Sequence, residues 1–296
     1  MTDLHMIDPG TLTAQLGWDY GDFPYGLEPL IMPAPGQGAA PGPPPPGLPA
    51  VYDVERARAA LELPPQAAGL AQPDTVDVLY WFRWITGHQV TMLLWHLMGA
   101  LVTAASEDDE ADDQVLADLE SYTNGYTAML QYSGSCPPEV YQSLIRPRMY
   151  LQHRCFSGLW AADFAPLRRL LRGHAMPWMT GPGGTRLAEA VAVNRSAHEA
   201  VAVRLVHGGR SLLQQSSVDT SARPTPRTSL IFDTFFMAAR APVGREAVVA
   251  QLLHRVRAVA LDLAANGSGG PSTAGAIIGS LQQVVASAAH HLPSTR

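Results

Sequence analysis

The chain contains little cysteine and little charge. Cys136 and Cys155 are the only cysteines among its 296 residues, which is too few for a disulfide framework. Charged residues make up 16% of the chain, whereas hydrophobic residues make up 47%. Many of its segments must therefore be buried in a sizeable core.

The sequence also lacks the features that would direct it to nucleic acid or to a membrane. The formal net charge is -6, and no basic cluster is long enough to follow a phosphate backbone, so we expect no nucleic-acid partner. The longest apolar run, residues 89–105, is interrupted by His96 and is too short to span a bilayer. Because residues 1–6 lack the basic and apolar regions of a signal peptide, we expect a cytoplasmic protein that does not enter a membrane.

Proline and glycine are concentrated near the start of the chain. Residues 33–36 and 41–47 consist mostly of these two residue types, a composition that favours extended chain and excludes helix. Aromatic residues just before these runs predict that residues 1–52 form an N-terminal arm that docks onto the body, and a disordered tail is the alternative. We expect residues 53–296 to form one helical domain.

Apolar residues in this domain recur every three or four positions, which is typical of buried helices. Convincing alternation of the kind found in strands does not occur, although 229–232 is a candidate for a short extended piece. We therefore predict an all-α fold, with a helix stop at 181–184 and a long irregular loop over 208–243, a kind of segment that is often functional. The predicted helices are 53–62, 76–105, 114–132, 138–153, 158–173, 185–207, 244–265 and 272–291.

One predicted helix has an aromatic face around a histidine. At 100° per residue, Trp81 and Trp95 fall within about 20° of His88, and Trp84 and Met92 within about 40°. Such a face suits a flat aromatic ligand. An ordinary hydrogen-bonded core histidine, surrounded by core packing, is the alternative.

A second predicted helix places His198 near Arg195, Ala202 and Arg204. Ala202 is small enough to let a flat ring approach the backbone, and the arginines are able to reach acidic groups of a ligand. Histidine is the usual nitrogen ligand of haem iron and a good acid or base. Two histidines from different helices are thus candidates for the two faces of a porphyrin. A core histidine is again the alternative, and His207 is a rival ligand.

Both segments resemble the haem-dependent aromatic oxygenase superfamily, to which tryptophan 2,3-dioxygenase belongs. The family's His-Gln pair followed by an apolar helix with Trp is similar to His88-Gln89 and Trp95 here. The family's ligand helix has Arg six residues after its His, as His198 and Arg204 have here.

Other segments separate the chain from the dioxygenases and bring it closer to bacterial haem-dependent L-tyrosine 3-hydroxylases. The dioxygenase arginine that holds the substrate carboxylate is replaced by Ala165, and the family's glycine-rich loop after the ligand helix is absent. Residues 145–149 and 156–160 resemble the hydroxylases. The resemblance covers roughly 76–215 and implies hydroxylation of L-tyrosine to L-DOPA, with hydrogen peroxide as the oxidant, in the biosynthesis of an antibiotic or other natural product.

The resemblance also implies roles for individual residues. His198 would be the iron ligand of a haem b, since no CxxCH sequence offers covalent attachment, and His88 would act on the opposite face as an acid or base toward the phenol. Arg146 and Arg148 are candidates for the substrate carboxylate, with a surface position as the alternative, and Ser157 is a further candidate for substrate binding. The candidates for holding the haem are Trp81, Trp84, Arg195, Ala202 and Arg204.

Three other functions remain open at this point. The chain is alternatively a dioxygenase of an indole or another aromatic amino acid, a haem-binding protein without catalysis, or a helical interaction protein without a cofactor. The sequence is also compatible with assembly of the chain into a homo-oligomer.

Overall fold

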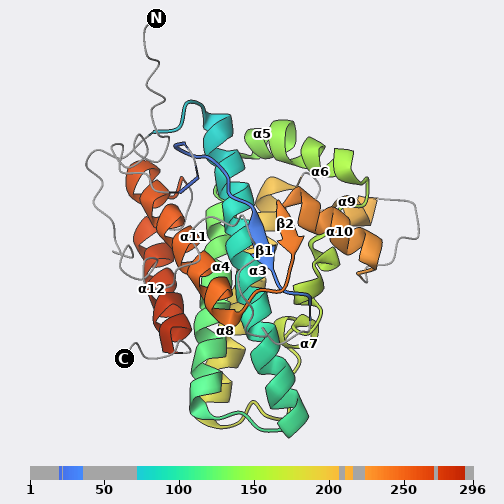
Figure 1. The fold of residues 1–296 in the computed structure, drawn as a ribbon, viewed down its shortest axis with the longest axis vertical. Helices are drawn as coiled ribbons and strands as arrows, with labels where there is room; N and C mark the ends of the chain where they lie inside the picture. The colour runs from blue at the N-terminus through green and yellow to red at the C-terminus, as the bar shows by residue number, and fades with distance from the viewer. Residues whose placement is uncertain are drawn as a thin grey trace, which may run out of the picture.

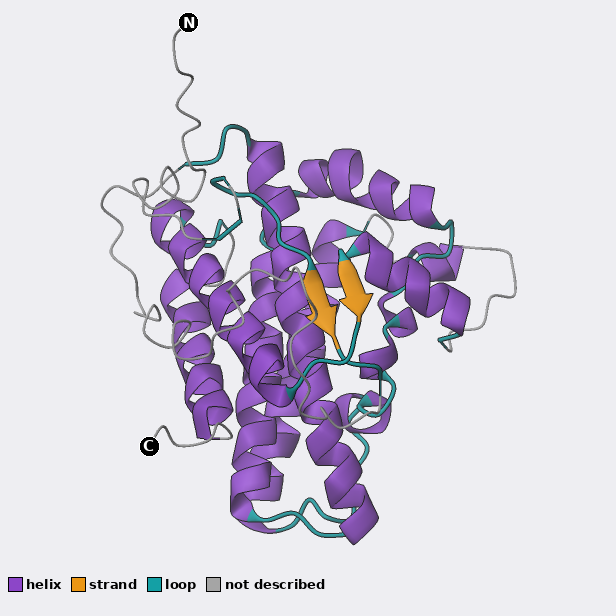
Figure 2. Ribbon diagram, in the orientation of Figure 1, coloured by secondary structure: helices purple, strands orange, loops and turns teal. Residues whose placement is uncertain are grey.

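The computed structural model describes residues 20–21, 23–35, 72–206, 211–215, 224–269 and 273–290. Within them the chain is mostly helical and has almost no strand, which confirms the predicted all-α class (Figures 1 and 2). A central helix, α3 (Val76–Asp108), packs against α4 (Asp113–Ser133) and α11 (Arg245–Asn266). The helices α8 (Gly181–Leu205) and α12 (Ala274–His290) pack on α4.

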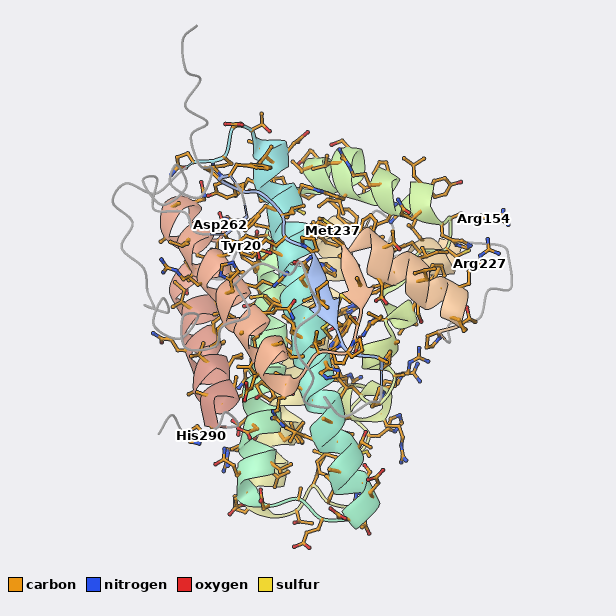
Figure 3. The ribbon with its side chains drawn as sticks, in the orientation of Figure 1. Tyr20, Arg154, Arg227, Met237, Asp262 and His290 are labelled. Atoms are coloured by element: carbon orange, nitrogen blue, oxygen red, sulfur yellow. The ribbon has the colours of Figure 1, made fainter. Side chains whose placement is uncertain are left out.

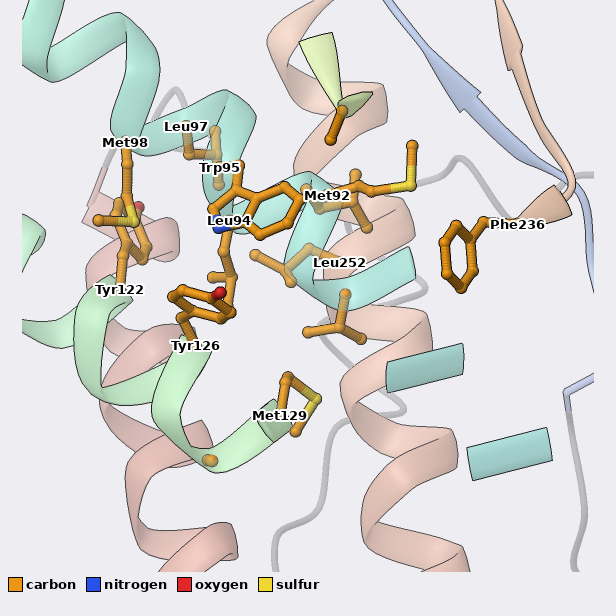
Figure 4. Packing of buried hydrophobic residues seen from close by; sticks show 14 of the residues in the cluster. Met92, Leu94, Trp95, Leu97, Met98, Tyr122, Tyr126, Met129, Phe236 and Leu252 are labelled. Carbon is orange, nitrogen blue, oxygen red and sulfur yellow. The ribbon is translucent and has the colours of Figure 1, made fainter. Parts of the chain in front are cut away.

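The central helix α3 is apolar around most of its circumference because other elements cover it. It begins after Thr75, whose hydroxyl accepts a hydrogen bond of 3.2 Å from the Val78 amide. It ends at Asp108, and the next residue, Asp109, has the left-handed conformation. Met92 and Trp95 of this helix point into the core, Trp95 toward Tyr126 of α4 (Figure 4). Among the described residues α3 is the one helix long and apolar enough to cross a membrane, yet 67% of its most apolar window is buried inside the protein.

A buried ion pair joins α3 to α11. Arg83 Nε lies 2.6 Å from Asp262 Oδ2, and the hydroxyl of Tyr132 on α4 donates to the same oxygen over 2.9 Å. Arg83 Nη2 also donates to the carbonyl of Gly267 over 2.6 Å. Figure 3 labels Asp262, the acidic partner of Arg83. Because a buried charge is tolerated only when it is paired and hydrogen-bonded, this network fixes how the three helices meet.

Part of the predicted arm lies against the helices. Tyr20 and Leu30 are fully buried, and β1 (Leu30–Met32) pairs in parallel with β2 (Ala238–Arg240). Gln251 on α11 accepts from the Ile31 amide over 2.9 Å and donates to the Ile31 carbonyl over 2.8 Å. The arm's predicted boundary at residue 52 and the predicted helix 53–62 lie outside the described residues.

The predicted loop 208–243 is wrong over its second half. Pro226–Phe235 forms a helix, α10, so the candidate extended piece at 229–232 is helical as well. Thr225 and Thr228 cap this helix reciprocally, and Pro226 occupies its first turn, where proline is favourable. A short helix, α9 (Leu212–Gln215), precedes it.

Two other predictions are also wrong: the start of one helix and the continuity of another. α8 begins at Gly181, so the glycines expected to stop a helix lie in its first turn together with Pro182. Residues 158–173 form short turns rather than one helix, because Pro166 has no amide hydrogen to donate. These turns are η3 (Gly158–Trp160), η4 (Ala162–Phe164) and α7 (Arg168–Leu171).

The segment after α4 is helical, as predicted, but not uniformly so. It consists of α5 (Pro138–Val140), the π-helical turn η2 (Tyr141–Ile145) and α6 (Arg146–Gln152). π-Helical turns are rare and frequently occur at functional sites.

Candidate functional site

His88 lies in the middle of α3, and a hydrogen bond fixes its tautomer. Its Nδ1 lies 2.6 Å from the carbonyl oxygen of Trp84. Because a carbonyl oxygen only accepts, Nδ1 must carry the proton of the neutral ring, and Nε2 is left as an acceptor. Burial lowers the pKa of His88 to about 4, so the imidazole is neutral near pH 7. Such a ring is suited to accept a hydrogen bond from a hydroxyl group.

Aromatic rings surround His88. Phe236, which follows α10, stacks on it with 4.4 Å between centroids and 10° between planes. Trp84 contacts the imidazole from its own helix, also at 4.4 Å, and in turn meets Tyr141 of η2 at 5.7 Å. Together these rings form what we call the aromatic cluster, whose members are Trp81, Trp84, His88, Tyr141, His153, Phe156, Trp160, Phe232, Phe235 and Phe236.

Two indole N–H groups of the aromatic cluster have no acceptor among the described residues. They are Nε1 of Trp84 and Nε1 of Trp160, and both atoms are buried. An unsatisfied buried donor costs about 1–3 kcal/mol, which a ligand with a suitable acceptor would offset. Trp95 and Tyr122, in the core between α3 and α4, also have buried atoms without a described partner, but of these residues only Trp84 contacts His88.

His198 lies on the exposed side of α8. Its side chain forms no hydrogen bond within the described part of the chain, and desolvation by neighbouring protein atoms lowers its pKa. An accessible, neutral imidazole is able to bind a metal through nitrogen. The described residues contain no group of three His, Cys, Asp or Glu side chains that would hold a metal ion by themselves. Haem iron needs fewer protein ligands, since the porphyrin supplies four nitrogens.

The C-terminal end of α4 connects the helices that carry the two histidines. Gly87, the residue before His88, packs so closely on this end that a side chain at position 87 would collide with it. Gly134 at the same end packs in the same way on Val201, three residues from His198 on α8. Close packing of glycine on a neighbouring helix thus brings both α3 and α8 against one helix end.

The π-helical turn η2 makes a second connection between these helices. Tyr141 contacts Trp84 of α3 at 5.7 Å, and Gln142 Nε2 donates to the carbonyl of Leu205 on α8 over 2.7 Å. Neighbouring side chains of this turn thus contact two different helices. The structure therefore positions His88 and His198 on helices that share two connecting elements.

The predicted substrate arginines lie at the edge of the aromatic cluster. Arg146 is half-buried and hydrogen-bonds to Tyr141. Arg148 is exposed, and its guanidinium lies over the Trp81 ring, 4.9 Å from the centroid. Ser157 caps η3, where its hydroxyl accepts from the Leu159 amide over 3.2 Å.

The other predicted haem-binding residues are distributed along α8. Arg195 is exposed, Ala202 is half-buried, and Arg204 donates to the Cys136 carbonyl over 2.9 Å. Burial raises the pKa of the Cys136 thiol to about 11, and Cys155 is buried as well. Both thiols are therefore poorly suited to act as nucleophiles. The roles of the arginines and Ala202 stay predictions.

Sequence reasoning missed Phe236, Tyr141 and Gln89, all of which contact or support the residues around His88. Phe236 was hidden in the segment predicted to be a loop. Tyr141 is placed by a π turn that leaves no signature in the helical periodicity. Gln89 was noted only as the neighbour of His88, although its buried amide binds the Phe236 carbonyl over 2.9 Å.

The fold and the site are those of a helical protein with a neutral histidine inside an aromatic cluster. Residues 37–192 match the family model described as SfmD 3-methyl-L-tyrosine peroxygenase. Because the match spans more than half of the chain, the protein belongs to this family and is an enzyme of the peroxygenase class. The match includes His88, whereas His198 and Phe236 lie beyond it. No curated protein matches the chain.

Proposed function

We propose that the protein is a haem-dependent peroxygenase that hydroxylates the ring of L-tyrosine with hydrogen peroxide, giving L-DOPA and water, in the biosynthesis of a natural product. Membership in a family named for a 3-methyl-L-tyrosine peroxygenase supports the oxidant and a tyrosine-type substrate. 3-Methyl-L-tyrosine is a second candidate substrate because the family carries its name. The burial of α3 accords with a cytoplasmic enzyme.

The observation that carries this proposal is the pair of groups formed by His88 and Trp84. His88 Nε2 is an acceptor, Trp84 Nε1 is a buried donor without a described partner, and the two rings lie 4.4 Å apart. A phenol hydroxyl both donates and accepts a hydrogen bond, so it complements the pair. His88 would bind the phenol and take up its proton as a general base. With a pKa of about 4, the imidazole is a weak base, so we expect proton transfer to accompany oxidation of the ring rather than precede it.

The residues present fit a haem b. His198 offers an accessible nitrogen with no other described partner to compete for it, and it would bind the iron. Arg195 and Arg204 lie on the same helix and would bind the propionates, while Ala202 leaves room for the ring. Trp81 and Trp84 would pack against the cofactor or the substrate. When bound, haem supplies the iron at which hydrogen peroxide is activated.

The carboxylate of the amino acid requires a cation, and arginine binds carboxylates through two parallel hydrogen bonds. Arg146 is the better placed candidate, because it hydrogen-bonds to Tyr141 inside the aromatic cluster. Arg148 lies further out, over Trp81. Ser157 would add a hydroxyl on the side of η3.

The proposal is tested by mass spectrometry of the products formed from L-tyrosine or 3-methyl-L-tyrosine by the haemin-supplemented protein with hydrogen peroxide. We expect a Soret band and a product with one added oxygen atom. Two added oxygen atoms would instead identify a dioxygenase, and a Soret band without any product a non-catalytic haem protein. A protein that stays colourless with haemin would contradict the proposal altogether.

A further inference from the structure

Gln89, the residue after His88, is a buried amide with every hydrogen-bonding position occupied. Its Nε2 donates to the carbonyl of Phe236 over 2.9 Å and to that of Glu28 over 3.0 Å. Its Oε1 accepts from Arg255 Nε over 2.9 Å and from the hydroxyl of Tyr20 over 3.3 Å. Two donated and two accepted bonds use the full capacity of an amide, so its orientation is fixed.

The carbonyl held by Gln89 belongs to the residue that stacks on His88. The next residue, Met237, has a φ of 55°, a left-handed conformation that is unfavourable for a residue with a side chain. Such a turn persists only where its surroundings hold it. Gln89 binds it at Phe236, and the Leu30 amide of β1 binds the Met237 carbonyl over 2.9 Å. Figure 4 shows the Phe236 ring on the segment that leads into β2.

Besides the Trp84 ring, two contacts hold the imidazole of His88. The bond from Nδ1 to the Trp84 carbonyl fixes one edge of the ring, and the stacked Phe236 ring fixes its plane. Gln89 is attached to the second of these contacts through the backbone of Phe236.

We propose that Gln89 is a positioning residue, which holds the Phe236–Met237 turn so that the Phe236 ring keeps His88 in the orientation used for catalysis. Its effect on rate rests on the proposed function. Its effect on the accessibility of the imidazole does not depend on that function and is measured separately.

The test compares Gln89→Glu, Phe236→Ala and the double variant, each in the full-length holoenzyme. Glutamate keeps an acceptor for Arg255 and Tyr20 but cannot donate to the Phe236 carbonyl. The first measurement is the rate at which diethyl pyrocarbonate modifies His88, followed by peptide mass spectrometry. The second is the kcat and KM for L-tyrosine. Gln89→Met, which is similar in shape and uncharged, serves as the second variant if Gln89→Glu does not fold.

We expect each single variant to speed the modification of His88 and to lower kcat by about tenfold, with little change in KM, as for loss of orientation of a general base. The double variant should be no worse than Phe236→Ala, because two changes that act through one contact are not additive. Parental reactivity of His88 in Gln89→Glu, or additive losses in the double variant, would overturn the proposal.

Gln251 provides a matched control. It is also a buried glutamine, 1% exposed, but it binds the backbone of Ile31 and Ala247 instead of Phe236. Gln251→Glu should lower stability and leave both the reactivity of His88 and kcat near the parental values. If Gln251→Glu changed the reactivity of His88 and kcat as much as Gln89→Glu does, the role of Gln89 would be merely structural. If the reactivity of His88 follows the expected pattern while no tyrosine is turned over, the positioning role stands and the proposed function fails.

Discussion

Burial of His88 makes the stability of the protein sensitive to mild acid. Its pKa is lowered to about 4 in the folded chain, against an ordinary value of about 6.5 once the chain unfolds. Between these values the unfolded chain binds more protons than the folded chain, so stability must fall as the pH falls. Removing the imidazole should therefore make the protein less sensitive to acid in this window.

The magnitude follows from the two pKa values. Protonation of His88 in the unfolded chain lowers the free energy of unfolding by about 2 kcal/mol at pH 5 and by very little at pH 7. His88→Phe keeps an aromatic ring against Phe236 but cannot titrate. The parent should thus lose about 2 kcal/mol more than this variant between pH 7 and pH 5. Carboxylates with lowered pKa values, such as Asp163 and Glu28, contribute to both proteins and cancel in the difference.

The measurement is urea unfolding, followed by far-UV circular dichroism, of the haem-free parent and variant at several pH values in this range. Haem is left out because a ligand that binds only the folded state adds its own stabilisation. Replacement of the exposed His174 by Phe controls for the loss of an imidazole in general. If the parent and His88→Phe lost the same stability between pH 7 and pH 5, the buried, neutral state assigned to His88 would be refuted.

Other variants test the individual roles in the proposed site. His88→Ala should keep its haem and lose about 10²–10⁴-fold in turnover; parental turnover in a steady-state assay would refute its role as a base. His198→Ala should lose most of its haem, or show an altered absorption spectrum, while the helices persist by circular dichroism; an unchanged spectrum would assign the ligand to another histidine. Trp84→Phe should raise the KM for L-tyrosine by about fivefold, because it removes a donor worth roughly 1 kcal/mol, whereas the control Trp95→Phe should not. Acidified organic solvent should extract the pigment, and pigment that stays with the protein would indicate a covalent link.

Features encoded locally could be predicted from the sequence. The apolar periodicity of α3, α4 and α11 predicted these helices to within a few residues, because burial of one face repeats with the helical turn. The same periodicity placed Trp84 on the face of His88, and the two rings are in contact. The ring on the other side of His88, which belongs to Phe236, could not be identified in this way.

Features that depend on distant segments could not be predicted. Phe236 stacks on His88 from nearly 150 residues away, and Pro226 begins α10, although a proline also marks the end of many helices. The four bonds of Gln89 reach Tyr20 and Glu28 before β1, Phe236 after α10, and Arg255 on α11. Neither periodicity nor a short motif carries information on such contacts, because they arise only when the whole bundle packs.

The origin of the oxygen atom in the product is the most direct test of the central claim. The purified, haem-loaded protein is given L-tyrosine and hydrogen peroxide labelled with oxygen-18, under unlabelled air, and the product is analysed by mass spectrometry. A peroxygenase must transfer one labelled oxygen atom from peroxide to the ring of L-DOPA. A product that carries only unlabelled oxygen, or no hydroxylated product at all, would contradict this account.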